Sequence, residues 1–273
     1  MRVISIIQAT LRKLSILVSD AVIYRQFTMA PQRCSQLATR GLRMFSIGRK
    51  LKNKFSKPRQ IEIALREIAL CEDALNFIDI GANRGDFIDL ALSLPVTTSI
   101  TAFEPIPALH KGLQRKYQHR AEVHIRNEAV SSKTGPKSFD LNIARPELSS
   151  FEKLTASAKE SYQVSDIESF EVQCIRLDSF LENQEQKPIF LKIDAQGHDY
   201  EILKSLSRRV ALSIKYILCE VPINPIYEGS FSWIDYLSLL HSLGFEPLAF
   251  EKVASNQEGR LIEADIVFRN ISL

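Results

Sequence analysis

The chain has 273 residues, of which 45% are hydrophobic and 25% are charged. This composition is that of a globular protein, and it excludes a collagen, a coiled coil and a wholly disordered chain. The net charge of +3 is unevenly distributed. Residues 1–60 carry 13 Lys and Arg and one acidic residue, a balance of +12, whereas residues 61–273 carry 22 basic and 31 acidic residues, a balance of −9. We therefore expect a basic arm followed by a mildly acidic globular domain.

The spacing of the cysteines and the length of the apolar runs indicate the cellular compartment of the protein. No C-x-x-C pair occurs, and the four cysteines are far apart: Cys34, Cys71, Cys174 and Cys219. This spacing argues against a disulfide framework and against a zinc site, and it favours a reducing compartment. No apolar run reaches the roughly 18 residues of a membrane-spanning helix. We therefore expect a cytoplasmic protein.

The basic arm begins with the pattern of an amphipathic helix, because apolar residues recur at spacings of three and four from Val3 to Ala21. A second basic stretch runs from Arg40 to Arg59. Three interpretations stay open: an arm that packs on the domain or on a second copy, a helix that lies on an anionic membrane surface, and an organelle-targeting leader. Because no aromatic residues alternate with the cations, we expect no nucleic-acid partner. The oligomeric state stays open.

From Asn76 onward, short apolar runs alternate with segments of helical period. The expected strands are 77–80, 100–103, 123–125, 189–193, 216–221, 245–250 and 261–268. The expected helices are 87–92, 108–117, 177–181, 199–206 and 233–243. Strands that alternate with helices predict a parallel sheet covered on both faces, and a hairpin of the last two strands adds one antiparallel strand.

The residues that follow each strand are informative, because ligands in an open α/β sheet bind at the carboxyl ends of the strands. The first strand leads into Asp79-Ile80-Gly81-Ala82-Asn83-Arg84-Gly85. Gly81 and Gly85 allow close approach of the backbone to a ligand, and the helix that begins there offers free N–H groups. The second strand leads to Glu104, about twenty residues further on, which is placed to bind the hydroxyls of a ribose. Loop and acid together predict a cofactor that contains adenosine.

The glycine loop distinguishes between two such cofactors. Asn83 stands where a dinucleotide-binding G-x-G-x-x-G loop has its middle glycine, and the loop does not match the phosphate-binding G-x-x-x-x-G-K-[ST] either. A cofactor with an amino-acid tail does not need such a close approach. Asp79 can face the ammonium group of that tail, and the N–H groups of the loop can face its carboxylate. S-adenosylmethionine therefore fits better than NAD.

These residues, with others in the same order, make the chain resemble the FkbM family of S-adenosylmethionine-dependent methyltransferases. The matching motifs, over about residues 75–250, are Asp79-Ile80-Gly81-Ala82-Asn83-x-Gly85, Phe103-Glu104-Pro105, Asn127-x-Ala129-Val130-Ser131, Leu177-Asp178, Lys192-Ile193-Asp194-Ala195-Gln196-Gly197-His198-Asp199 and Glu220. One departure is Asp199, where the family more often has Glu. The resemblance implies the class I methyltransferase fold, a Rossmann-like α/β fold with a seven-stranded sheet, and methylation of an oxygen on a saccharide or another small molecule.

The resemblance also implies site residues. By this resemblance, the methionine part of the cofactor is expected to be held by Asp79, Gly81, Asn83 and Gly85. Glu104 is expected to bind the ribose, and Glu128 and Ala129 are expected to border the adenine. The second set borders the expected methyl position and is predicted to be catalytic: Lys192, Asp194, His198 and Glu220.

Each predicted catalytic residue has a proposed role. Lys192 and Asp194 end the fourth strand and share one of its faces. Asp194 is expected to accept the proton of the acceptor hydroxyl, with Lys192 setting its ionisation or orienting the acceptor. His198 is a candidate second base, and Glu220, after the fifth strand, is a candidate acceptor contact. No ligand spacing demands a metal, so none is expected.

Residues 131–175 break the strand–helix rhythm. They contain many Ser, and only 137–141 and 171–175 have a strand-like pattern. Because mobile loops on a rigid scaffold often carry specificity, we expect residues 131–170 to form a lid or an acceptor-binding insert.

The sequence also bears on which atom is methylated and on two alternative functions. An N-P-P-Y type of motif, typical of amine methylation, is absent after the fourth strand, which favours an oxygen acceptor. An NAD-dependent oxidoreductase or epimerase shares the sheet and the ribose-binding acid, but the chain has no obvious Tyr-x-x-x-Lys pair. A non-catalytic, membrane-docking module built around the basic arm is the other alternative.

Overall fold

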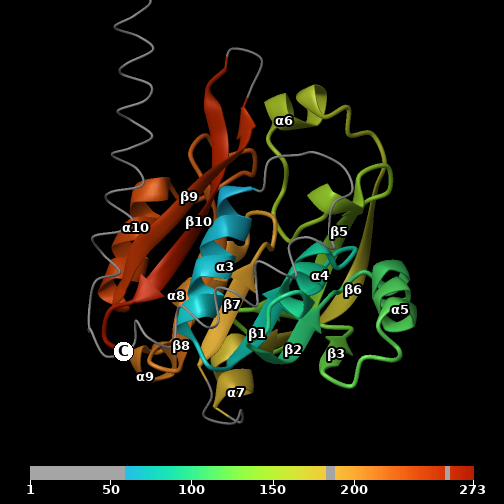
Figure 1. Ribbon diagram of the computed structural model, residues 1–273. Coiled ribbons are helices and arrows are strands. Elements are labelled where there is room, and N and C mark those ends of the chain that lie inside the picture. The colour runs from blue at the N-terminus through green and yellow to red at the C-terminus, as the bar shows by residue number, and fades with distance from the viewer. Residues whose placement is uncertain (1–58, 183–187, 256–258) are drawn as a thin grey trace, which may run out of the picture. The chain divides into compact units, whose positions relative to one another are not determined.

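The computed structural model describes residues 59–182, 188–255 and 259–273 (Figure 1, whose labels are used below). Apart from Arg59 and Gln60, the basic arm lies outside these ranges, so its helix and its three interpretations stay predictions. Within the described part, no helix has the length and hydropathy of a membrane span. The three cysteines of that part are unpaired: Cys71, Cys174 and Cys219.

A seven-stranded sheet is the main element of the described chain, in the order β3-β2-β1-β7-β8-β10-β9. Strand β10 runs antiparallel to both of its neighbours, and the other pairs in this sheet are parallel. The strands are β1 (Leu75–Ile80), β2 (Thr97–Phe103), β3 (Val123–Arg126), β7 (Ile189–Ile193), β8 (Ile214–Pro222), β9 (Phe245–Ser255) and β10 (Leu261–Asn270). The predicted mostly parallel sheet with one antiparallel strand is confirmed.

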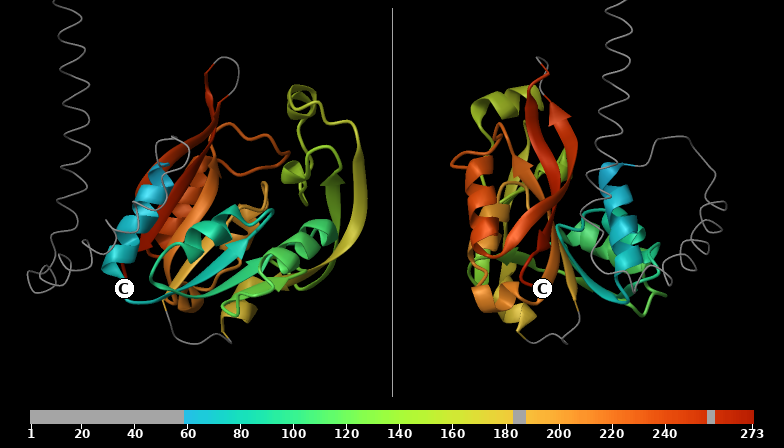
Figure 2. Two further views of the ribbon diagram at one scale, coloured as in Figure 1. Left: turned by 45° about the vertical axis from the view of Figure 1, so that its right-hand side comes forward. Right: turned by 60° about the vertical axis from the view of Figure 1, so that its left-hand side comes forward.

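Both faces of this sheet are apolar, because its central strands alternate between two cores. In β1, Phe77 packs into one core and Ile78 and Ile80 into the other. Figure 2 shows the two sets of covering helices on opposite faces. The first set is α3 (Gln60–Cys71), α4 (Asp86–Leu92) and α5 (Pro107–Lys116), and the second is α7 (Leu177–Leu181), α8 (Asp199–Lys204), α9 (Arg208–Ala211) and α10 (Trp233–Ser242). Helices on both faces are therefore confirmed.

Helix α3 is an addition to the predicted elements. Its buried side has helical period, with Ile61, Leu65 and Ile68 in the first core. Arg59, just before it, forms ion pairs with Glu251 of β9 at 3.1 Å and with Asp265 of β10 at 3.2 Å. Asp265 lies opposite Glu220 near the carboxyl end of β8. The first turn of α3 is thereby fixed beside the expected site.

Residues 129–176 hold a second, three-stranded sheet that was not expected. Its order is β4-β6-β5, with β4 (Ala129–Ser131), β5 (Gly135–Asn142) and β6 (Ile167–Arg176). The two predicted strand-like pieces are confirmed as parts of β5 and β6. The first three residues of β6 are exposed, and inward and exposed residues alternate only from Phe170 to Cys174, so only its second half has a strand-like pattern. A 3-10 helix, η1 (Pro146–Leu148), and α6 (Ala156–Ser161) connect β5 to β6.

The strand order switches at β1, which lies between β2 and β7. In the register of the sheet, Asp79 of β1 is opposite Lys192 of β7, and Ile80 is opposite Phe103 of β2. Because connections leave to opposite sides here, the carboxyl ends of these strands open onto the crevice in which α/β sheets bind ligands.

Candidate active site

The loop that joins β1 to α4 lies against the end of β7. Gly81 has a φ of +77°, and a β-carbon there would overlap the carbonyl oxygen of Asp194. Gly85 has a φ of +85° at the start of α4 and lies against the ring of Tyr117. Asn83, between them, has a left-handed φ of 48°, which Asn adopts more readily than most residues. Backbone geometry therefore explains both glycines and favours Asn at the middle position.

Asp79 and Lys192 form an ion pair beneath this loop. Asp79 is fully buried, and its Oδ1 accepts a hydrogen bond from Lys192 Nζ at 3.0 Å. The same ammonium group donates to the carbonyl oxygen of Gly81 at 3.2 Å and lies 3.4 Å from Asp194 Oδ2. Burial lowers the pKa of Lys192, but the charges of Asp79 and Asp194 outweigh it, so that the pKa is raised. Lys192 is therefore a stable ammonium group whose three protons all face oxygen atoms.

The second oxygen of Asp79 is a buried acceptor without a hydrogen-bond partner among the described residues. Burial raises the pKa of Asp79, and the charge of Lys192 counteracts that rise. An unsatisfied buried acceptor costs roughly 1–3 kcal/mol. This oxygen therefore marks a position where a bound donor, such as the ammonium group of an amino-acid tail, would stabilise the site.

Glu104 ends β2 and is held by backbone N–H groups. It is 3% exposed, and its Oε2 and Oε1 accept from the N–H groups of Asn83 at 2.8 Å and of Ile106 at 2.9 Å. Burial raises the pKa of Glu104 to about 7, although both hydrogen bonds counteract the rise. Each carboxylate oxygen keeps a second lone pair. Glu104 can therefore accept two further hydrogen bonds, as a ribose diol requires.

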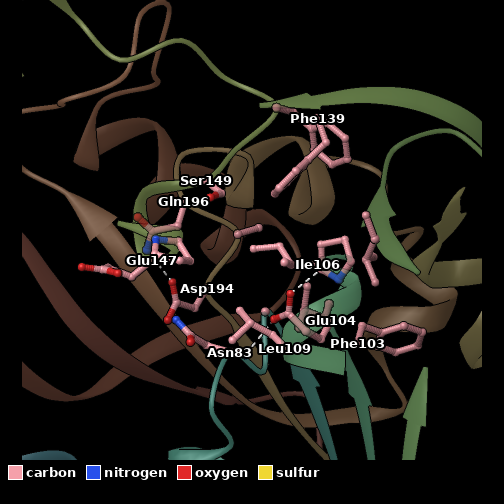
Figure 3. A pocket seen from close by; sticks show the side chains of 18 of the residues that line it. Asn83, Phe103, Glu104, Ile106, Leu109, Phe139, Glu147, Ser149, Asp194 and Gln196 are labelled. Carbon is pink, nitrogen blue, oxygen red and sulfur yellow. Dashed lines mark hydrogen bonds between the residues drawn. The ribbon is translucent and has the colours of Figure 1, made fainter. Parts of the chain in front are cut away.

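A cavity of about 120 Å³, here called the smaller cavity, opens beside Glu104 (Figure 3). Predicted residues Glu128 and Ala129 line it, and Arg126 binds the carboxylate of Glu128. Its apolar lining comes from both sheets and from the loops that join them: Ile80, Phe103, Ile106, Leu109, Val130, Phe139 and Phe151. Apolar walls with a few placed polar groups are typical of a small-molecule site.

A cavity of about 520 Å³, the larger cavity, lies between α3, α4 and the carboxyl ends of β7 and β8. Its lining is mainly charged, with the carboxylates of Glu62, Asp86, Glu147, Asp194, Glu220 and Asp265 and the cations of Arg59, Arg84 and Lys192. Arg59 and Lys192 are already engaged in the ion pairs described above. These pairs also engage Asp265 and Asp194, so outside them the carboxyl groups of Glu62, Asp86, Glu147 and Glu220 still outnumber the one remaining cation, Arg84.

The two cavities meet, because both are lined by Gly81, Asn83, Asp194 and Glu147. Asp194 is 37% exposed, and its Oδ1 accepts a hydrogen bond from Gln196 Nε2 at 2.8 Å. Glu147 comes from η1, between β5 and β6, and its side chain is 54% exposed. Sequence reasoning missed Glu147, since it lies in the segment without a helical or strand pattern. Figure 3 shows Asp194, Asn83 and Glu147 on one side of the smaller cavity.

Glu220 lines the larger cavity from the end of β8. Burial, together with the charges of Asp194 and Glu263, raises its pKa well above the ordinary value. Glu220 therefore takes up a proton more readily than an exposed glutamate, and a protonated carboxyl group can donate as well as accept hydrogen bonds. Its placement agrees with the predicted contact to an acceptor.

His198 lies elsewhere, and the structure does not bring it to either cavity. It is 2% exposed, with Nε2 at 2.8 Å from Ser131 Oγ and Nδ1 at 2.8 Å from Glu152 Oε1. Both ring nitrogens are engaged, so the role of second base has no support in this geometry. His198 instead ties the helix that follows β7 to the second sheet and its loops. No local pattern could have revealed this, because its partners lie far away in the sequence.

The site thus brings together most of the predicted residues. Six of them are joined by the contacts above or line the shared boundary: Asp79, Gly81, Asn83, Glu104, Lys192 and Asp194. Glu128 and Ala129 line the smaller cavity, and Glu220 lines the larger one. Gly85 is the N-cap residue of α4, at the end of the loop after β1. Within the described ranges, no group of three or more His, Cys, Asp or Glu is spaced to hold a metal ion.

Several solved structures align with this chain at low sequence identity. An FkbM methyltransferase from Methylobacillus flagellatus KT aligns with a TM-score of 0.45 at 12% identity, over 72% of this chain and 44% of that protein, so this chain spans less than half of its length. An rRNA methylase from Streptococcus thermophilus aligns at 0.44 and 7% identity, over 79% and 99%. Magnesium protoporphyrin IX methyltransferase from Synechocystis PCC 6803, solved with bound S-adenosylmethionine, aligns at 0.42 and 9%, over 89% and 99%. At these values no residue role is transferred from them.

The sequence itself assigns the family. No curated protein matches the chain. A model of the methyltransferase FkbM domain matches residues 79–247, which is more than half of the chain and includes the loop after β1, Glu104, Lys192, Asp194 and Glu220. The chain therefore belongs to the FkbM methyltransferase family, whose members transfer methyl groups from S-adenosylmethionine.

Proposed function

We propose that the protein methylates a hydroxyl group of a small-molecule or saccharide acceptor. The observation that carries this proposal is the position of Asp194 at the boundary of two cavities, one apolar and one rich in carboxylates. A group that lines both can touch the acceptor beside the cofactor. The acceptor is assigned to the larger cavity and the nucleoside to the smaller one.

Asp79, buried beneath the loop after β1, and the residues around the smaller cavity fit S-adenosylmethionine. The unpartnered Oδ2 of Asp79 would accept from the ammonium group of the methionine part. Glu104 would bind the ribose through its two remaining lone pairs, and Glu128 and Ala129 would border the adenine. When bound, the cofactor supplies an electrophilic methyl group. The chain contributes alignment, and orientation of two reactants alone can account for roughly 7–11 kcal/mol of a barrier.

Asp194 would accept the proton of the acceptor hydroxyl as the oxygen attacks. Its Oδ2 faces the ammonium group of Lys192 at 3.4 Å, and its Oδ1 faces the amide of Gln196. These two contacts hold the carboxylate at the boundary of the cavities. Glu147, on the same boundary, would also contact the acceptor, so the loop between β5 and β6 would take the acceptor-binding role predicted for residues 131–170.

The charge of the larger cavity supports a polyhydroxyl acceptor. Carboxylates accept hydrogen bonds from hydroxyl groups, whereas a phosphate would need cations, and of the three cations only Arg84 is outside the ion pairs described above. A nucleic acid or a nucleotide would bring phosphates into this cavity. We therefore favour a neutral saccharide or other polyol. Membrane contact through the basic arm and a cytoplasmic location are further parts of the proposal.

The two alternatives from the sequence are not retained. An NAD-dependent oxidoreductase would need a close approach of pyrophosphate to the loop at Asn83. A purely membrane-docking module would leave Asp194 without a role. Membership of a methyltransferase family accounts for the site without either.

The proposal is tested by incubating the protein with methyl-labelled S-adenosylmethionine and fractionated cell extract and identifying the labelled product. Asp194→Asn should lower the rate of labelling at least about 100-fold, which is the lower range for loss of a general base. The dissociation constant for S-adenosylhomocysteine should stay within about twofold, because Asp79 and Glu104 remain. Glu182→Gln, which removes one exposed carboxylate at the end of α7, is the control and should alter neither quantity. Labelling at the unchanged rate by Asp194→Asn would contradict the role of Asp194.

A further inference from the structure

The side chain of Gln196 connects Asp194 to a tyrosine that no motif singled out. Its Nε2 donates to Asp194 Oδ1 at 2.8 Å, and its Oε1 accepts from the hydroxyl group of Tyr227 at 2.9 Å. A tyrosine hydroxyl has one proton to donate, and the carbonyl oxygen of Leu148 lies at 3.5 Å, too far to compete. The proton of Tyr227 therefore determines which end of the Gln196 amide faces Asp194.

The backbone of Gln196 is held as firmly as its side chain. Gln196 and Gly197 have left-handed φ values of 51° and 89°, a conformation that needs support at a non-glycine residue. Asp199 supplies that support, because its carboxylate accepts from the N–H groups of Ala195 at 3.0 Å and of Gly197 at 3.1 Å. Ser150 donates to the carbonyl oxygen of Gln196 at 2.5 Å. The conformation of the turn after β7 is thus stabilised from two directions, and the role of Asp199 here is structural.

Tyr227 is itself anchored in a packed cluster. It is 5% exposed and packs with Leu154 and Ala158, and a β-bridge joins it to Leu154. Its ring lies against Gly197, where a β-carbon would come within 2.7 Å of Tyr227 Cδ2. These contacts hold the Tyr227 ring in place, so that its hydroxyl group stays beside Gln196.

These contacts fix both oxygens of Asp194. Oδ1 faces the amide of Gln196, and Oδ2 faces the ammonium group of Lys192. Without the hydroxyl group of Tyr227, the Gln196 amide could rotate and present its oxygen to Asp194, which would repel the carboxylate instead of binding it.

We propose that Tyr227 and Gln196 are positioning residues for methyl transfer, which orient the carboxylate of Asp194 toward the acceptor hydroxyl. The inference rests on the proposed function, since it assumes that Asp194 accepts the proton. Tyr227 acts only through Gln196. We expect neither residue to hold the cofactor, because Tyr227 lines neither of the two cavities and both polar atoms of the Gln196 side chain already bind Asp194 and Tyr227.

The test compares Tyr227→Phe, Gln196→Glu and the double variant. Initial rates of methyl labelling are measured at saturating cofactor in the extract fraction that the wild-type protein labels. The dissociation constant for S-adenosylhomocysteine is measured by calorimetry. Tyr200→Phe is the matched control for the tyrosine, because Tyr200 is a partly buried ring of α8 that lines neither cavity. Gln173→Glu, an exposed change on β6, is the control for the glutamine.

Tyr227→Phe should lower the labelling rate about tenfold, the factor that corresponds to one hydrogen bond of ordinary strength. Gln196→Glu should lower it about 100-fold, because it keeps the contact to Tyr227 and places a carboxylate against Asp194. The double variant should be no more than about twofold slower than Gln196→Glu alone. Neither the dissociation constant nor the rates of the two controls should change more than about twofold.

Three results would overturn the inference: an unchanged rate in Gln196→Glu, effects that multiply in the double variant, or a dissociation constant that worsens as much as the rate. Gln196→Glu leaves the packing of Tyr227 intact and therefore carries the test even where Tyr227→Phe fails to fold. Failure of the proposed function gives a different pattern, in which Asp194→Asn labels as fast as the wild-type protein.

Discussion

The two cavities differ in how they are built, and under the proposed function this difference separates binding of the cofactor from choice of the acceptor. The smaller cavity has apolar walls and one deeply buried acid, Glu104, whose carboxylate is held by two backbone N–H groups. The larger cavity is lined by charged side chains, several of them exposed, from α3, α4 and three strands. A carboxylate held by backbone N–H groups, such as Glu104, suits a cofactor that is always the same. Long side chains around a wide cavity can be replaced to suit a different acceptor.

The strongest effect is expected where both cavities share a backbone position. Gly81→Ala introduces a β-carbon that overlaps the carbonyl oxygen of Asp194 and a left-handed φ that costs a non-glycine residue roughly 1–2 kcal/mol. The free energy of unfolding should fall by more than about 2 kcal/mol, and binding of S-adenosylhomocysteine should be lost. Urea denaturation and calorimetry measure the two quantities.

Gly112→Ala is the matched control for that change. Gly112 lies in α5 with open space around it and without a left-handed φ, so alanine should stabilise the protein by about 0.5–1 kcal/mol. Equal effects of the two substitutions would show that the loop after β1 has no special backbone requirement.

Glu104→Gln tests the buried acid of the smaller cavity. The pKa of Glu104 is raised from 4.5 to about 7, so its contribution to stability is full below pH 4.5 and is lost as the pH rises through about 7. In the ligand-free wild-type protein this loss is up to about 3 kcal/mol. Glu104→Gln should remove that part of the pH dependence and weaken binding of S-adenosylhomocysteine about tenfold. Urea denaturation at pH 5 and pH 8 and calorimetry provide the measurements.

Other buried acids also titrate, so the difference between the two proteins is the informative quantity. Burial raises the pKa of Asp265 to about 6, and it does the same for Asp199. Both are present in wild type and variant. Stability curves that stay parallel from pH 5 to pH 8 would contradict the buried state of Glu104.

The smallest effect belongs to Glu147 in the larger cavity. Its side chain is 54% exposed, and an exposed hydrogen bond to an acceptor contributes about 0.5–1.5 kcal/mol. Glu147→Gln should therefore raise the KM for the acceptor about threefold to tenfold and leave the dissociation constant for S-adenosylhomocysteine unchanged. Glu168→Gln, an exposed change on β6, should affect neither. A change in cofactor binding alone would show that Glu147, which lines both cavities, serves the cofactor and not the acceptor.

The main sheet and the second sheet differ in how far they could be predicted from the sequence. The strands of the main sheet are apolar on both faces, and the residues after β1, β2, β7 and β8 follow them directly, so both the sheet and Asp79, Glu104, Lys192 and Asp194 could be predicted. Of the second sheet, only the pieces 137–141 and 171–175 could be predicted, because β4 has three residues and the first three residues of β6 are exposed.

Contacts between distant segments were beyond sequence reasoning. His198 was assigned to chemistry because it follows Asp194 closely, but Ser131 and Glu152 occupy its ring nitrogens. Tyr227 and Glu147 belong to no motif, and their places depend on how the segments after β8 and β5 fold over the end of β7. A sequence pattern reflects only the spacing of residues along the chain, whereas these residues contact segments that are distant in the sequence.

The most direct measurement is a crystal structure of the protein with S-adenosylhomocysteine. The account predicts the adenosine in the smaller cavity, the ribose hydroxyls on Glu104, the ammonium group on Asp79 Oδ2, and the sulfur atom facing Asp194. Adenosine bound in the larger cavity, or a Glu104 carboxylate that does not touch the ribose, would contradict it.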